Sequence, residues 1–162
     1  MSAVTLLDGL KARGETVAVA ESLTGGLLAA TIVDVPGASA AFRGGLIVYA
    51  TDLKATLAGV PLPLLDAHGP VDPSVAAALA AGARERCGAD WGIATTGVAG
   101  PEPQAGQPVG RVYIAVAGIG EPLVRKLDLT GDRAAIRRAT VDAALDLAAS
   151  AVAGAPSRTV RG

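Results

Sequence analysis

The stretch Thr16–Gly26, TVAVAESLTGG, decides the fold that this sequence predicts. Residues 16–20 are short and rich in apolar and β-branched side chains, as is typical of a buried interior strand. A polar cluster follows at once, and residues 27–33 then continue as an apolar helix. In α/β proteins, a polar turn between the carboxyl end of a strand and a helix is a common place for a functional site.

This polar turn supplies the first candidate functional residues. Ser22 is the candidate nucleophile, and backbone N–H groups near residues 24–26 could hold an anion or a developing oxyanion. The glycines would let the backbone approach a ligand closely. The residues of this turn that we assign to substrate binding are Glu21, Thr24, Gly25 and Gly26. The alternative is that Ser22 or Thr24 only caps the following helix.

The composition limits the class of protein. A chain of 162 residues fits one domain, which we place at residues 1–154, with a flexible tail at 155–162. The net charge is −1 and no basic run occurs, which argues against a nucleic-acid partner. A single cysteine indicates a reducing cytoplasm, and no segment is long enough to span a membrane. Abundant alanine and glycine predict close packing of small side chains against a sheet.

Helices and strands alternate along the chain. Strands are predicted at residues 16–20, 45–50, 91–95, 112–117 and 123–129; helices at 2–13, 27–33, 51–59, 73–86 and 132–152. Residues 61–70 are predicted to be a turn-rich connector, and residues 96–110 a Gly/Pro-rich loop. Strands joined through helices are usually parallel, whereas the last two strands form a hairpin. The prediction is therefore a three-layer α/β/α fold with a mixed, mostly parallel five-stranded sheet.

Lys54 follows the second predicted strand as Ser22 follows the first. It falls in the first turn of the helix predicted from residue 51, where the helix dipole disfavours a positive charge. Such an amine should lose its proton more readily, especially if buried, and a neutral lysine can act as general base toward a serine. Because parallel strands end at one edge of a sheet, Ser22 and Lys54 should share a crevice. The alternative is a solvated surface lysine.

Other strand ends reach the same edge. Tyr49, at the end of the second strand, could donate a hydrogen bond there, and Thr95, Thr96 and Gly97 end the third strand. Carboxylates are sparse at this edge, and no cluster of metal ligands is apparent, so we predict neither a metal nor a cofactor. His68 is the only histidine, so a Ser-His-Asp triad would need it. Its position in the connector favours a structural role.

Six segments together resemble the CinA C-terminal domain family. They are AESLTGG (20–26), VPGASAAFRGGLIVYATDLK (35–54), HGPV (68–71), TTGVAGP (95–101), PVGRVYIAV (108–116) and GDRAAIRR (131–138). They occur in order along nearly the whole chain. The resemblance implies a three-layer α/β/α fold with a mixed sheet. The enzymatic members are nicotinamide-nucleotide amidohydrolases, which convert nicotinamide mononucleotide (NMN) to nicotinate mononucleotide and ammonia.

The resemblance also implies roles for individual residues. The family's serine and lysine fall on Ser22 and Lys54, and the tyrosine of its motif falls on Tyr49. Thr96 matches the threonine of the third-strand loop, and Thr96, Gly97 and Gly100 are placed to contact substrate. Arg137 matches an arginine of the last helix and would pair with the phosphate. We expect a metal-independent acyl transfer by a cytoplasmic protein that forms a homo-oligomer.

The sequence departs from the family pattern at three places. Leu23 stands where cysteine is common, Ala50-Thr51 stand where Ser-Asn is common, and the loop Pro101–Pro108 is shorter and poorer in glycine than usual. The catalytic serine and lysine are retained. The alternative function is a binding module that keeps the pocket and serves in competence or recombination, with a recombinase partner that only the resemblance implies.

Overall fold

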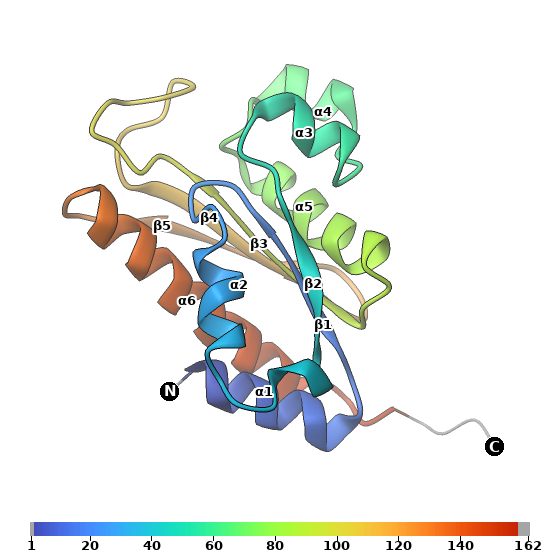
Figure 1. Cartoon of the computed structure of the whole chain (residues 1–162). Helices are drawn as coiled ribbons and strands as arrows, with labels where there is room; N and C mark the ends of the chain where they lie inside the picture. The colour runs from blue at the N-terminus through green and yellow to red at the C-terminus, as the bar shows by residue number, and fades with distance from the viewer. Residues whose placement is uncertain (1, 159–162) are drawn as a thin grey trace.

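The computed structural model describes residues 2–158, which form one five-stranded sheet covered by helices on both faces (Figure 1). The strands are β1 (Val17–Glu21), β2 (Phe42–Ile47), β3 (Trp91–Gly97), β4 (Arg111–Ala117) and β5 (Leu123–Asp128), in the spatial order β2-β1-β3-β4-β5. β1 pairs in parallel with β2 and β3, whereas β3–β4 and β4–β5 are antiparallel. The predicted fold class is confirmed, although parallel and antiparallel pairs are equal in number among the described residues.

The helices form two outer layers. α1 (Ser2–Arg13), α2 (Leu27–Val33) and α6 (Arg133–Gly154) cover one face; α3 (Thr51–Thr56), α4 (Leu62–His68) and α5 (Pro73–Arg86) lie on the other (Figure 1). A single 3-10 turn at Ala38–Ala40 precedes β2. Each face of the sheet has its own apolar cluster, so β1 and β3 are buried on both sides. No helix of residues 2–158 has both the length and the apolar character needed to span a bilayer.

Small side chains let α5 lie close to the sheet, as the composition predicts. Gly92 of β3 lies against the backbone of α5, where a Cβ would come within 2.0 Å of the Ala80 carbonyl oxygen. Gly82 of α5 is packed equally tightly against the Ala58 carbonyl. The surrounding contacts are made mainly by alanines of α5, β1 and β3. Any larger residue at Gly92 would therefore push α5 away from β1 and β3.

Several predicted segments differ from the structure. The helix predicted over residues 51–59 ends at Thr56, and the strand predicted over 91–95 extends to Gly97. β2 spans residues 42–47 rather than 45–50, because its glycines tolerate the strand geometry and Val17 pairs with Phe42. The predicted connector 61–70 contains a helix, α4, which begins after Pro61. The predicted tail, residues 155–162, begins with two residues that contact α1: the carbonyls of Ala155 and Pro156 accept hydrogen bonds from Arg13. Residues 159–162 lie outside the described part of the chain.

Candidate active site

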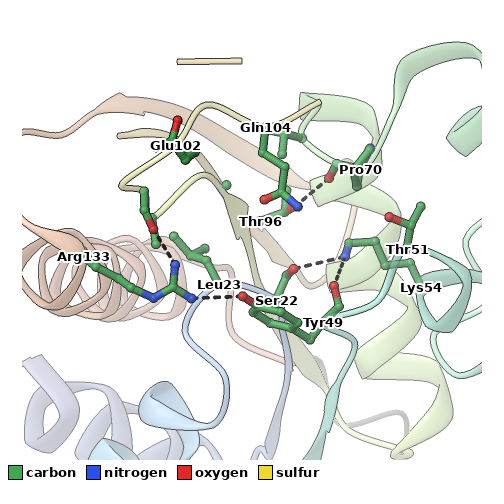
Figure 2. A pocket seen from close by; sticks show the side chains of 14 residues that line it. Ser22, Leu23, Tyr49, Thr51, Lys54, Pro70, Thr96, Glu102, Gln104 and Arg133 are labelled. Carbon is green, nitrogen blue, oxygen red and sulfur yellow. Dashed lines mark hydrogen bonds between the residues drawn. The ribbon is translucent and has the colours of Figure 1, made fainter. Parts of the chain in front are cut away.

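The carboxyl ends of β1, β2 and β3 open into one pocket (Figure 2). Polar side chains and backbone groups converge on it, as is typical of a small-molecule site. Residues from five separate segments line it, namely the turn after β1, the turn after β2 with α3, the connector between α4 and α5, the end of β3 with its loop, and the start of α6. Both Ser22 and Lys54 are among them, as the parallel arrangement of β1 and β2 requires.

Ser22 and Lys54 form a buried pair. Lys54 Nζ donates to Ser22 Oγ at 3.0 Å and to the Val48 carbonyl at 2.8 Å. The Lys54 side chain is 1% exposed and Ser22 is 7% exposed. A buried lysine needs a partner for its charge or must release its proton. In residues 2–158 no carboxylate forms an ion pair with Lys54, so its partners are neutral oxygens only.

Burial lowers the pKa of Lys54 to about 8 from an ordinary value of 10.5, because the charged amine is removed from water. At pH 7, about one-tenth of the lysine would then be neutral, compared with less than about one in a thousand for a solvated lysine. A neutral Nζ within hydrogen-bond distance of a hydroxyl is the arrangement that general-base activation of a serine requires.

Of the two predicted causes of this pKa shift, burial and the helix dipole, only burial applies. α3 is only six residues long, and Lys54 is its fourth residue, within its last turn. A helix dipole therefore does not disfavour the charge at this position. Burial of the amine lowers the pKa, and no neighbouring cation contributes. The expectation of a proton-releasing lysine is met through desolvation alone.

Tyr49 lies beyond the end of β2, and its side chain forms one wall of the pocket (Figure 2). Its hydroxyl accepts a hydrogen bond from Arg133 Nη2 at 3.0 Å, and its ring is 60% exposed. The backbone carbonyl of Tyr49, not its hydroxyl, contacts Lys54 Nζ, at 3.4 Å. Tyr49 thus faces the pocket as predicted, but its phenol is directed to Arg133 rather than to Ser22.

The end of β3 supplies the opposite wall. Thr96 is buried and donates its hydroxyl proton to the Pro70 carbonyl at 2.6 Å, which leaves its oxygen free to accept a hydrogen bond from a ligand. Gly97 and Gly100 also line the pocket, as predicted. A Cβ on Gly97 would come within 2.6 Å of Val112, so a side chain at that position would displace β4. Thr96, Gly97 and Gly100 are therefore brought together with Ser22 and Lys54.

Sequence reasoning missed three polar residues that line the pocket, namely Arg133, Glu102 and Gln104. Arg133 is the cation among them. It is the first residue of α6; it donates to the Gly100 carbonyl at 2.6 Å and faces the pocket beside Tyr49 (Figure 2). Asp132 caps this helix through the N–H of Ala135 and so sets where α6 begins. The sequence marks Asp132 as the start of a helix, but it does not show that the next side chain reaches the pocket.

Comparison with known proteins identifies the family. The CinA C-terminal domain family model matches residues 2–152. This chain belongs to the CinA C-terminal domain family. A CinA-like protein of Frankia casuarinae is 54% identical over 152 residues, which are 94% of this chain and 35% of that protein. A CinA-like protein of Anaeromyxobacter sp. is 49% identical over 85% of this chain and 34% of its own length. The chain thus spans about a third of the length of these relatives.

Solved CinA structures share the fold. The competence/damage inducible protein CihA of Agrobacterium tumefaciens superposes with a TM-score of 0.86 at 34% identity and covers 90% of each chain. The competence damage-inducible protein A of Klebsiella pneumoniae gives a TM-score of 0.92 at 28% identity and covers 96% of this chain and 97% of its own.

Four residues of this CinA domain that the sequence predicts to bind substrate instead have structural roles within the fold. The Glu21 carboxylate is fully buried and accepts from the N–H groups of Leu28 and Ala29 at 2.8 and 3.0 Å, so it caps α2 in place of a ligand. Thr24 is buried and its hydroxyl bonds that of Thr95 at 2.7 Å. Gly25 and Gly26 adopt left-handed conformations, with φ of 56° and 108°, that turn the chain from β1 into α2. None of these four lines the pocket.

Arg137 also has a different environment from the one the resemblance implied. Its guanidinium donates to the backbone carbonyls of Leu23 and Thr24 and does not line the pocket. A Ser-His-Asp triad is not formed either. His68 is the last residue of α4 and lies outside the pocket, with its imidazole 3.5 Å from the Asp72 carboxylate. Within residues 2–158, no three His, Cys, Asp or Glu side chains are grouped so that they could hold a metal ion.

Proposed function

We propose that this CinA domain hydrolyses the carboxamide of NMN to nicotinate mononucleotide and ammonia. The observation that carries the proposal is the buried contact of 3.0 Å between Lys54 Nζ and Ser22 Oγ, at the wall of the pocket. The choice of NMN comes from the family resemblance. A binding module would not require a lysine with a lowered pKa directly beside a serine hydroxyl.

The proposed reaction is an acyl transfer in two steps. Ser22 Oγ attacks the carboxamide carbon while neutral Lys54 takes the hydroxyl proton. The C–N bond then breaks, and Lys54 returns that proton to the leaving ammonia. Water attacks the resulting ester, Lys54 accepts a proton from the water, and Ser22 recovers its hydroxyl as the acid leaves. Unpaired backbone N–H groups near Ser22 stabilise the oxyanion in both steps.

Ammonia release tests this function directly. We expect wild-type protein to form ammonia and nicotinate mononucleotide in equal amounts from NMN, because one C–N bond is cleaved per turnover. The reaction uses only side chains and water, so treatment with a chelator should leave the rate unchanged. Activity that is lost in chelator and restored by a divalent cation would contradict this mechanism. Absence of ammonia under all conditions would favour the competence-related binding module.

Arg133 is the proposed ligand of the NMN phosphate. Its guanidinium faces the pocket beside Tyr49, whereas Arg137 does not reach the pocket. A hydrogen bond to a charged group contributes about 1.5–3 kcal/mol, so Arg133→Met should raise the KM for NMN by about 10- to 100-fold with little change in kcat. Steady-state kinetics with nicotinamide riboside provide the control, since it lacks the phosphate. Equal losses on both substrates would exclude a phosphate-binding role.

A further inference from the structure

One guanidinium clamps the loop that follows the nucleophile. Arg137, half-buried on α6, donates from Nε to the Leu23 carbonyl and from Nη2 to the Thr24 carbonyl, each at 2.9 Å. The guanidinium lies against Gly25, where a Cβ would stand 3.6 Å from Nη2. In residues 2–158, Arg137 is the only donor to the Leu23 carbonyl. The two bonds match the fork geometry that arginine, unlike lysine, provides.

The clamp fixes the direction of backbone N–H groups as well as carbonyls. In a trans peptide, the C=O and N–H of one unit are coplanar and point in opposite directions. Arg137 holds the Leu23–Thr24 unit through its carbonyl. The preceding Ser22–Leu23 unit is held through the Ser22 carbonyl, which accepts from the N–H of Gly25 at 3.1 Å. The N–H groups of Leu23 and Thr24 are therefore both fixed in direction.

These two N–H groups have no acceptor among residues 2–158, although Leu23 is 3% exposed and Thr24 is fully buried. Buried backbone N–H groups are nearly always paired, so two consecutive unpaired groups need an explanation. Leu23 lines the pocket directly after the nucleophile. The N–H of the residue after a nucleophilic serine is a common oxyanion donor in acyl-transfer enzymes.

We propose that Arg137 is a positioning residue: by holding the Leu23 and Thr24 carbonyls it fixes the turn after Ser22, so that the N–H of Leu23, which lines the pocket, acts as an oxyanion donor for the reaction at Ser22. The proposal rests on the proposed acyl-transfer function and replaces the phosphate-binding role that the resemblance implied for this arginine. Oxyanion donors act most strongly as charge develops on the substrate oxygen, so their misplacement lowers kcat rather than substrate affinity.

Kinetics of Arg137→Met and Arg137→Lys with NMN test this role. A small misplacement of reacting groups can cost about 100-fold in rate, so we expect kcat to fall by about that factor with KM unchanged. Arg137→Lys keeps the charge but cannot bond both carbonyls in the same geometry, so it should also lose most of its kcat. Arg138→Met is the matched control, because Arg138 is exposed on the same helix. Melting temperatures would show whether Arg137→Met or Arg137→Lys fails to fold. If one of them does, the kcat of the other tests the proposal.

A fluorophosphonate probe supplies a second readout that does not depend on NMN. Ser22 Oγ forms a bond to phosphorus, the P–F bond breaks with loss of fluoride, and Lys54 takes the serine proton. The phosphonyl oxygen then needs the same oxyanion donors. Labelling of Ser22 should slow in both Arg137 variants by about the factor seen in kcat and stay unchanged in Arg138→Met. Native kcat and native labelling in both Arg137 variants, or a loss confined to KM, would overturn the proposal. Labelling of the wild type without ammonia from NMN would instead refute the proposed substrate.

Discussion

Ser22→Ala is expected to lower the rate of ammonia release from NMN by about 10⁴-fold or more, as loss of the nucleophile does in other acyl-transfer enzymes. The change removes the only atom that can form the acyl-enzyme. NMN binding should persist, because Arg133 and the Thr96 wall are untouched. Rates of ammonia release and the Kd for NMN, measured on one preparation, check both parts of this prediction.

The stability of Ser22→Ala should change little. Ser22 is buried, but its hydroxyl has Lys54 Nζ as partner, and Lys54 keeps its bond to the Val48 carbonyl. Loss of one such hydrogen bond costs about 1 kcal/mol. Ser39→Ala is a matched control at an exposed site away from the pocket. Turnover by Ser22→Ala at the native rate would mean that this serine has no covalent role.

Lys54→Arg should be nearly inactive even though the positive charge is kept. Guanidinium does not release its proton in proteins, so the variant has no base to activate Ser22. General-base catalysis contributes about 10²–10⁴-fold, and we expect a loss in kcat/KM of at least that size. Lys126→Arg is the control, since Lys126 on β5 is half exposed and outside the pocket. An active Lys54→Arg variant would remove the serine–lysine mechanism.

Lys54→Met separates loss of the base from loss of the fold. Arginine is larger than lysine and Lys54 is 1% exposed, so Lys54→Arg could also disturb packing. The lowered pKa corresponds to a cost of about 3 kcal/mol for burying the charged amine at neutral pH. Methionine removes that cost, which offsets the lost hydrogen bonds. Lys54→Met should therefore be inactive with a melting temperature close to that of the wild type.

The contact between Ser22 and Lys54 could be predicted because it depends on topology. Parallel neighbouring strands end at one edge of a sheet, so residues that follow β1 and β2 must meet, whatever their side chains do. Ser22 and Lys54 satisfy this rule, and so does Thr96 near the end of β3. The same rule placed Tyr49 at the pocket, but it could not show that the phenol turns toward Arg133.

The roles of Glu21, Arg133 and Arg137 could not be predicted, because they depend on where side chains point. Glu21 precedes the nucleophile and looked like a site carboxylate, yet it caps α2, whose N-cap residue Gly26 offers no side chain. Arg133 and Arg137 are four residues apart on one helix, so helical spacing places them on the same face. Only the packing of α6 against the loop shows that Arg133 reaches the pocket and Arg137 the loop carbonyls.

Two element boundaries failed for local reasons. Residues 61–70 contain two prolines before His68 and one after it, a composition typical of turns, yet Pro61 and Pro63 fall at the start of α4, where proline is tolerated. β2 begins three residues earlier than predicted, because Gly44 and Gly45 pair with β1 despite their low strand propensity. A Cβ at position 45 would come within 2.4 Å of Val19, so close approach of β1 explains glycine there.

The dependence of kcat/KM on pH, measured by ammonia release from NMN, tests the central claim that neutral Lys54 activates Ser22. Because burial lowers the pKa of Lys54 to about 8, the lysine is mostly protonated and inactive below that pH and mostly neutral above it. Between pH 7 and pH 10, above the second phosphate pKa of about 6, kcat/KM should rise through a single ionisation near pH 8 and then level off. A flat profile, or a rise that continues to pH 10 as for a solvated lysine, would contradict the account.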